Sequence, residues 1–110
     1  PVSYAELEEK VAPCGELGRY LTDQVVEWNA RYVDRPMEYR SLGDSPAVGV
    51  LMYPDCGPWR MQPAPKFAPD MRYLHPGTNR PIRVYEGVDA RFIHEDFFAK
   101  LRRFARGDGR

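Results

Sequence analysis

Residues Ser41 to Pro54 read SLGDSPAVGVLMYP, and this stretch predicts a short apolar helix with a carboxylate at its start. Pro46 falls at an early helical position, where the N–H that proline lacks is not needed. The residues that follow are apolar on every side, and Pro54 then ends the helix because proline cannot continue it. The stretch therefore predicts a helix over about 45–53 that is buried all round.

Asp44 directly precedes this helix, and two explanations of it stay open. Its side-chain oxygen can cap the helix by accepting a backbone N–H, which stabilises a helix by about 1 kcal/mol. Alternatively, a carboxylate that leads into an apolar helix lies at the rim of a core, where desolvation is costly unless a cation compensates. A bound metal ion would supply the positive charge that offsets this desolvation cost.

The composition excludes several classes of protein. The chain has 110 residues, enough for one small domain, and its 16 basic residues balance 16 acidic ones. Without a net charge, we expect neither nucleic acid nor an anionic membrane surface as a partner. The hydrophobic share of 43% lies outside the range of disordered chains. No apolar run reaches about 18 residues, so no transmembrane helix is predicted.

The N-terminus and the cysteines bear on processing and location. The chain begins with Pro1 rather than Met, so we expect either that a leader or a larger N-terminal part was removed or that the chain was processed. The opening PVSYAELEEK is too acidic for a signal peptide. Cys14 and Cys56 could pair in an oxidising compartment, but their spacing does not suggest zinc. We expect a cytoplasmic protein.

Three further helices are predicted. Ser3 and Glu6 form a capping-box pattern that opens a helix over about 3–11. A stripe at three- and four-residue steps predicts a helix over about 16–32, and a second stripe predicts one over about 90–105. The stripes consist of Leu17, Tyr20, Leu21, Val25, Trp28 and Tyr32, and of Phe92, Ile93, Phe97, Leu101 and Phe104.

The rest of the chain is irregular or extended. Alternation of apolar and polar residues predicts a strand over about 81–87. The segment 54–80 is rich in proline, which excludes long regular elements, with room for short strands at 59–61 and 71–74.

These elements predict an α/β fold that is incomplete by itself. A helix that is apolar on all faces needs neighbours on all sides, and one strand cannot make a sheet. We therefore treat 1–110 as a single segment of a larger α/β core, which another chain or a missing N-terminal region completes.

The order of these pieces resembles the C-terminal third of the inosine-uridine preferring nucleoside hydrolases, over Ser3 to Leu101. The likeness is carried by ELGRYLTDQVVEW, then LGDSPAVGVLMYP, then a proline-rich excursion, then RPIRVYEGVDARFIHEDFFAKL. The resemblance implies an open sheet with flanking helices. It also implies hydrolysis of the N-glycosidic bond of a ribonucleoside to ribose and free base.

In that family the matching aspartate is a ligand of the catalytic calcium ion, so the resemblance implies that Asp44 is a metal ligand. Calcium takes six to eight oxygen ligands, so Asp44 would share the ion with residues outside this chain. The chain departs from the family in two ways. Gly43 stands where many members carry a histidine that helps to protonate the leaving base, and the N-terminal aspartate cluster D-x-D-x-x-x-D-D is absent.

Aromatic and titratable residues supply further candidates. Tyr32 and Tyr39 lie in the segment that leads to Asp44 and could contact the base by stacking or through the phenolic O–H. Packing or surface roles are open for both, and Trp28 with Tyr32 is more typical of a core. His75 and His94 are more typical of structural or exposed histidines than of catalysts.

Two functions remain. In the first, the chain is the C-terminal part of a calcium-dependent nucleoside hydrolase, an oligomer that is active only with its N-terminal portion or a partner subunit. In the second, it is a non-catalytic scaffold or interaction subunit that retains the fold and lacks the metal site. Asp44 favours the first if the chain is a fragment, and Gly43 with the missing aspartates favours the second if the chain is complete in nature.

Overall fold

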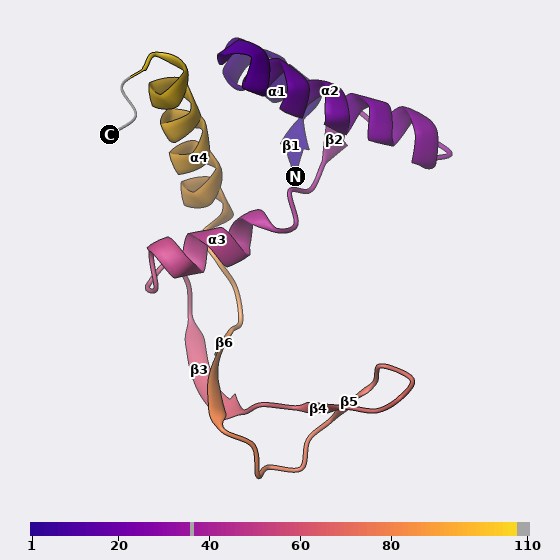
Figure 1. The fold of residues 1–110 in the computed structure, drawn as a ribbon, viewed down its shortest axis with the longest axis vertical. Helices are drawn as coiled ribbons and strands as arrows, with labels where there is room; N and C mark the ends of the chain where they lie inside the picture. The colour runs from indigo at the N-terminus through magenta and orange to yellow at the C-terminus, as the bar shows by residue number, and fades with distance from the viewer. Residues whose placement is uncertain (36, 108–110) are drawn as a thin grey trace. The chain divides into compact units, whose positions relative to one another are not determined.

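A computed structural model describes residues 1–35 and 37–107 as two compact units. The first unit consists of Pro1–Ala47 and Ala90–Arg110, and the second of Val48–Asp89. Figure 1 labels the helices and strands along the chain. The chain combines four helices with short antiparallel strands within the described residues, so the prediction of a mixed α/β chain is confirmed.

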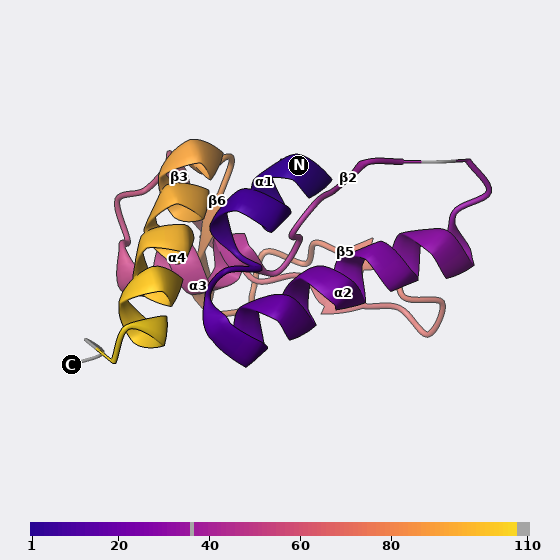
Figure 2. The same cartoon turned by 90° about the horizontal axis from the view of Figure 1, so that it is seen from above.

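Three helices of the first unit lie where the sequence places them. They are α1 (Tyr4–Lys10), α2 (Gly15–Tyr32) and α4 (Ala90–Ala105). The hydroxyl of Ser3 accepts the N–H of Glu6 at 3.1 Å, which is the predicted N-cap of α1. After α2 the chain returns to the start of α1 (Figure 2), where β2 (Tyr39–Arg40) pairs antiparallel with β1 (Val2–Ser3).

The core of the first unit lies between α1, α2 and α4. It consists of Val2, Leu7, Val11, Cys14, Phe98 and Leu101. Phe98 of α4 is fully buried. A residue of the last helix therefore packs in the same core as residues from the first fourteen positions of the chain. The stripe predicted over 90–105 therefore does face a core, although Phe92 and Phe104 of that stripe are exposed.

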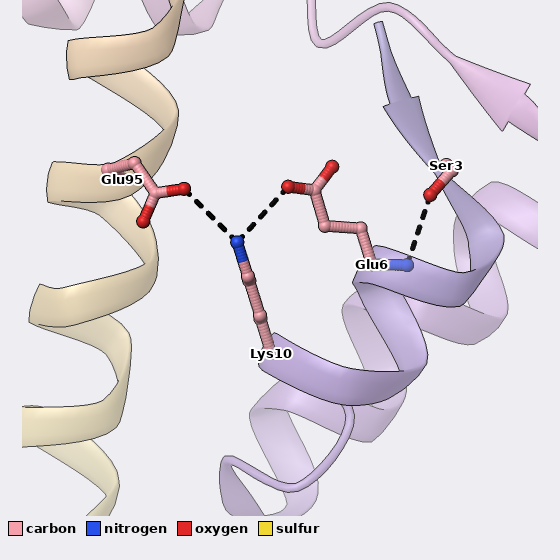
Figure 3. A network of polar contacts seen from close by, with 4 residues as sticks. All are labelled: Ser3, Glu6, Lys10 and Glu95. Atoms are coloured by element: carbon pink, nitrogen blue, oxygen red, sulfur yellow. Dashed lines mark hydrogen bonds and ion pairs between the residues drawn. The ribbon is translucent and has the colours of Figure 1, made fainter.

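A polar contact also joins α1 to α4. The ammonium group of Lys10 lies 3.2 Å from Oε1 of Glu6 and 3.1 Å from Oε1 of Glu95 (Figure 3). It also lies 5.3 Å from the centre of the Phe98 ring. Lys10 therefore links two helices at the edge of the core that they share.

The predicted core face of α2 is wrong in part. The buried residues of this helix are Gly18, Thr22 and Asn29, while Leu17, Tyr20, Trp28 and Tyr32 of the predicted stripe are exposed. The reason is close packing at Gly18, where an added Cβ would lie 2.0 Å from the carbonyl oxygen of Val11. Gly18 and the small residues beside it therefore lie on the side of α2 that packs against α1. Leu21 and Val25 lie at the edge of this side and pack against the core.

Helix α3 (Ser45–Met52) spans the boundary between the units, and the second unit consists of its last five residues followed by antiparallel strands. Strands β3 (Trp59–Pro63) and β6 (Pro81–Tyr85) pair antiparallel, with Trp59 opposite Tyr85 and Pro63 opposite Pro81. Between them, β4 (Lys66–Phe67) pairs with β5 (Tyr73–Leu74). The prediction of a strand at 81–87 corresponds to β6, and the short strands expected at 59–61 and 71–74 correspond to β3 and β5.

The prediction that the helix over 45–53 is buried all round is wrong for this chain. In α3 only Gly49 is buried, and Leu51 is 82% exposed. Val48 and Met52 are exposed as well. A helix that is apolar on every side needs neighbours on every side, and the described residues cover only part of it.

Two further observations concern the whole chain. The sequence pattern predicts a single segment over 1–110. The contacts in the structure instead divide the chain into the first and second units. Among the described residues, no helix is both long enough and apolar enough to cross a membrane.

Candidate functional site

Asp44 lies at the turn that starts α3. The N–H of Ser45 donates to the carbonyl of Leu42 at 3.3 Å, and the N–H of Ala47 donates to the carbonyl of Asp44 at 3.1 Å. These bonds form the turn through main-chain atoms alone. Within the described residues, the carboxylate of Asp44 makes neither a hydrogen bond nor an ion pair, and the residue is exposed. The side chain is therefore unengaged, and the capping explanation has no hydrogen bond to support it.

Asp44 follows closely on a residue that packs against the core of the first unit. Leu42, two residues earlier, is partly buried and packs against the hydrophobic core of the first unit. Asp44 itself is exposed, and the apolar helix α3 begins with the next residue. A carboxylate in this place is free to bind a partner from solvent or from another part of a protein.

Tyr32 lies at the last position of α2 and forms a ring pair with Trp28. The ring centroids are 4.4 Å apart and the planes are tilted by 40°. Tyr32 is 61% exposed and Trp28 is 47% exposed, so neither belongs to the core. The assignment of this pair to a core is wrong, because the contact face of α2 lies on the side of Gly18 and Thr22.

Arg40 adds a cation to this aromatic pair. Its guanidinium carbon lies 5.1 Å from the centre of the Trp28 ring, and its Nη1 donates to Oδ1 of Asn29 at 3.1 Å. Sequence reasoning missed both Trp28 and Arg40 as site candidates. The signal for Trp28 was its four-residue spacing from Tyr32, whereas the contact of Arg40 with α2 depends on the return of the chain.

Tyr39 lies in β2, and its backbone is held firmly while its side chain is exposed. The Nδ2 of Asn29 donates to the Tyr39 carbonyl at 2.9 Å, and Ser3 is its partner across the strand pair. Successive side chains in a strand point to opposite faces, so Tyr39 points away from the face on which Arg40 meets Trp28. No ring contact joins Tyr32 to Tyr39 among the described residues.

The other candidates occupy structural positions. The ring of His94 stacks on Phe98 with centroids 6.3 Å apart, and the ring of His75 meets the edge of Tyr73 at 6.5 Å. Cys14 is buried and Cys56 is partly buried, and both are free thiols. Each histidine thus contacts an aromatic ring, and the two cysteines form no disulfide.

The described residues bring no full set of metal ligands together. Within residues 1–35 and 37–107, no three His, Cys, Asp or Glu side chains come together in a way that could hold a metal ion. Calcium takes six to eight oxygens, and Asp44 supplies one carboxylate. Asp44 would therefore need further oxygen ligands beside it to hold a calcium ion.

Comparison of the chain with models of protein families, with curated proteins and with solved structures finds no match.

Proposed function

We propose that this chain is the C-terminal portion of a calcium-dependent nucleoside hydrolase, which cleaves the N-glycosidic bond of a ribonucleoside to ribose and base. In this proposal Asp44 supplies one of the oxygen ligands of the ion. An N-terminal region or a partner subunit supplies the others and completes an open sheet with flanking helices. The assembly is an oligomer of the cytosol.

The proposal rests on the exposure of Asp44 and on the lack of a polar partner for its carboxylate among the described residues. The carboxylate is exposed and makes no hydrogen bond or ion pair with any described residue, directly before a helix whose apolar side chains are also exposed. An unengaged acid and an uncovered apolar helix at the same place are both expected where a further part of the protein packs and shares a ligand.

The aromatic pair Trp28 and Tyr32 supports a nucleoside as substrate. Exposed indole and phenol rings provide flat surfaces on which a nucleobase can stack, and Arg40 keeps a cation beside them. We assign base contacts to Tyr32 and Trp28. Tyr39 stays a candidate for a contact through its exposed phenol.

The second candidate is a non-catalytic scaffold or interaction subunit. It is favoured by Gly43, which stands where many members of the family carry a histidine, and by a donor set that is too small for calcium. In this alternative the exposed face of α3 serves only to bind another subunit.

Purification of the native protein from its source, followed by intact-mass measurement, distinguishes the two candidates. Copurification with an aspartate-rich N-terminal region, in the same chain or in a partner, together with release of base from inosine or uridine, supports the hydrolase. A folded monomer of 12.7 kDa without any partner contradicts it.

A further inference from the structure

Asn29 is a buried amide whose hydrogen bonds all go to the segment that returns to β1. The residue is 5% exposed. Its Nδ2 donates to the carbonyl of Met37 at 3.3 Å and to the carbonyl of Tyr39 at 2.9 Å, and its Oδ1 accepts from Nη1 of Arg40. Both donor positions of the amide and one acceptor position are therefore used.

Residues 37–40 are hydrogen-bonded from two sides. The side-chain amide of Asn29 bonds to one side, and the main chain near the N-terminus bonds to the other. Val2 is paired with Arg40, and the N–H of Tyr4 donates to the carbonyl of Glu38 at 2.8 Å. Met37 and Tyr39 bond to Asn29, and Glu38 between them bonds to Tyr4, so three consecutive carbonyls are fixed from alternate sides.

Arg40 extends the same network to an exposed ring. Its guanidinium group donates to Asn29 and also lies over the Trp28 ring, which in turn meets Tyr32. A cation over an indole face restrains the ring and leaves its remaining surface open. The network thus connects a buried amide to the aromatic pair at the end of α2.

We propose that Asn29 and Arg40 are positioning residues, which hold residues 37–40 and the Trp28 ring in one arrangement so that the aromatic pair Trp28–Tyr32 is preorganised for a planar ligand. The inference that residues 37–40 are held in one arrangement depends only on the hydrogen bonds described above. The identity of the planar ligand as a nucleobase rests on the proposed function.

Hydrogen exchange of the 110-residue chain tests the ordering. In Asn29→Asp the side chain keeps its shape and its acceptor for Arg40 but loses both donors, and it places a carboxylate against two carbonyls. Exchange of amides in 33–42 should rise at least about tenfold, while amides of α4 keep their protection. Gln24→Glu is the matched control, since Gln24 is exposed on the same helix and the change is again amide to carboxylate.

Arg40→Met separates this role from a general loss of folding, because Arg40 is only partly buried. If Asn29→Asp loses protection throughout the chain, Arg40→Met decides the question. The proposal expects faster exchange in 33–42 for Arg40→Met, with partial recovery in Arg40→Lys. Exchange in 33–42 that matches the unmodified chain in Arg40→Met overturns it.

A second readout reports on the ring itself. In a Trp59→Phe background, Trp28 is the remaining tryptophan. Compared with this background, acrylamide should quench the Trp28 fluorescence more strongly in Arg40→Met, with a smaller increase in Arg40→Lys. Equal quenching in the background and in both Arg40 variants contradicts the restraint on the ring. In the complete enzyme, Arg40→Met should raise KM for the nucleoside several-fold with a smaller change in kcat. Failure of the hydrolase assignment would remove this last effect and leave the exchange and fluorescence results intact.

Discussion

Nζ of Lys10 and Oε1 of Glu95 lie 3.1 Å apart, and this pair joins α1 to α4 across 85 residues of sequence. The hydrogen bond that Lys10 donates to Glu95 is the main reason that the pKa of Lys10 is raised above its ordinary value of 10.5, followed by the bond that it donates to Glu6. Because the folded state holds the proton more tightly, the contribution of Lys10 to stability is fully present below about pH 10.5 and declines as the pH rises further.

Replacement of Lys10 by Met should therefore lower the free energy of unfolding at neutral pH. The difference from the unmodified chain should shrink in strongly alkaline solution and in high salt, which screens partly exposed ion pairs. Urea titrations at several pH values measure it. Lys66→Met, at an exposed lysine of β4, is the control and should change little. A difference that is independent of pH would refute the role of the charge.

Glu8 gives the opposite dependence on pH. Two guanidinium nitrogens of Arg19 bond to its two carboxylate oxygens, at 3.2 and 2.8 Å, and these hydrogen bonds lower the pKa of Glu8 below 4.5. The stability from this pair is present above about pH 4.5 and is lost as the pH falls through the lowered value. Glu8→Gln should destabilise the chain at pH 7 and make no difference in strong acid.

The control for this pair is Glu9→Gln, since Glu9 is an exposed neighbour on the same helix. Its stability should follow that of the unmodified chain at all pH values. Thermal unfolding followed by circular dichroism provides the comparison, and equal melting temperatures of Glu8→Gln and the unmodified chain at pH 7 would exclude a contribution from Glu8.

Gly18 should not tolerate a side chain. An added Cβ would lie 2.0 Å from the Val11 carbonyl oxygen and 3.0 Å from Cβ of Cys14, so Gly18→Ala must push α2 away from the end of α1. We expect a loss of about 1–3 kcal/mol in the free energy of unfolding, despite the better helix propensity of alanine.

Gly43→Ala is the matched comparison, because the space around Gly43 is open. Denaturant titrations of both variants measure the contrast. A Gly18→Ala chain that is as stable as Gly43→Ala would show that the close packing of α1 and α2 does not matter.

The positions of the helices could be predicted because their signals are local. Ser3 and Glu6 set the start of α1, Pro46 and Pro54 bracket α3, and the apolar spacing of α4 marks its buried face. The pairing of β3 with β6 could not be predicted in the same way. It joins residues about twenty apart across a proline-rich segment, and no local pattern specifies such a register.

The burial of α2 and α3 was predicted less well than their positions. An apolar stripe indicates a face that avoids water, but it does not say whether this chain or another part of a protein covers that face. In α2 the approach at Gly18 turned the small residues inward and left Trp28 and Tyr32 exposed. The network of Asn29 with Met37, Tyr39 and Arg40 depends on a chain return that no spacing rule encodes.

If the proposed hydrolase assembly can be isolated, calcium-dependent release of base from inosine or uridine tests the role of Asp44 most directly. The measurement compares Asp44→Asn with Asp55→Asn, which changes an exposed aspartate just after α3 in the same way. The account predicts that Asp44→Asn abolishes turnover and lowers bound calcium in elemental analysis, while Asp55→Asn does neither. Unchanged turnover and calcium content in Asp44→Asn would contradict it.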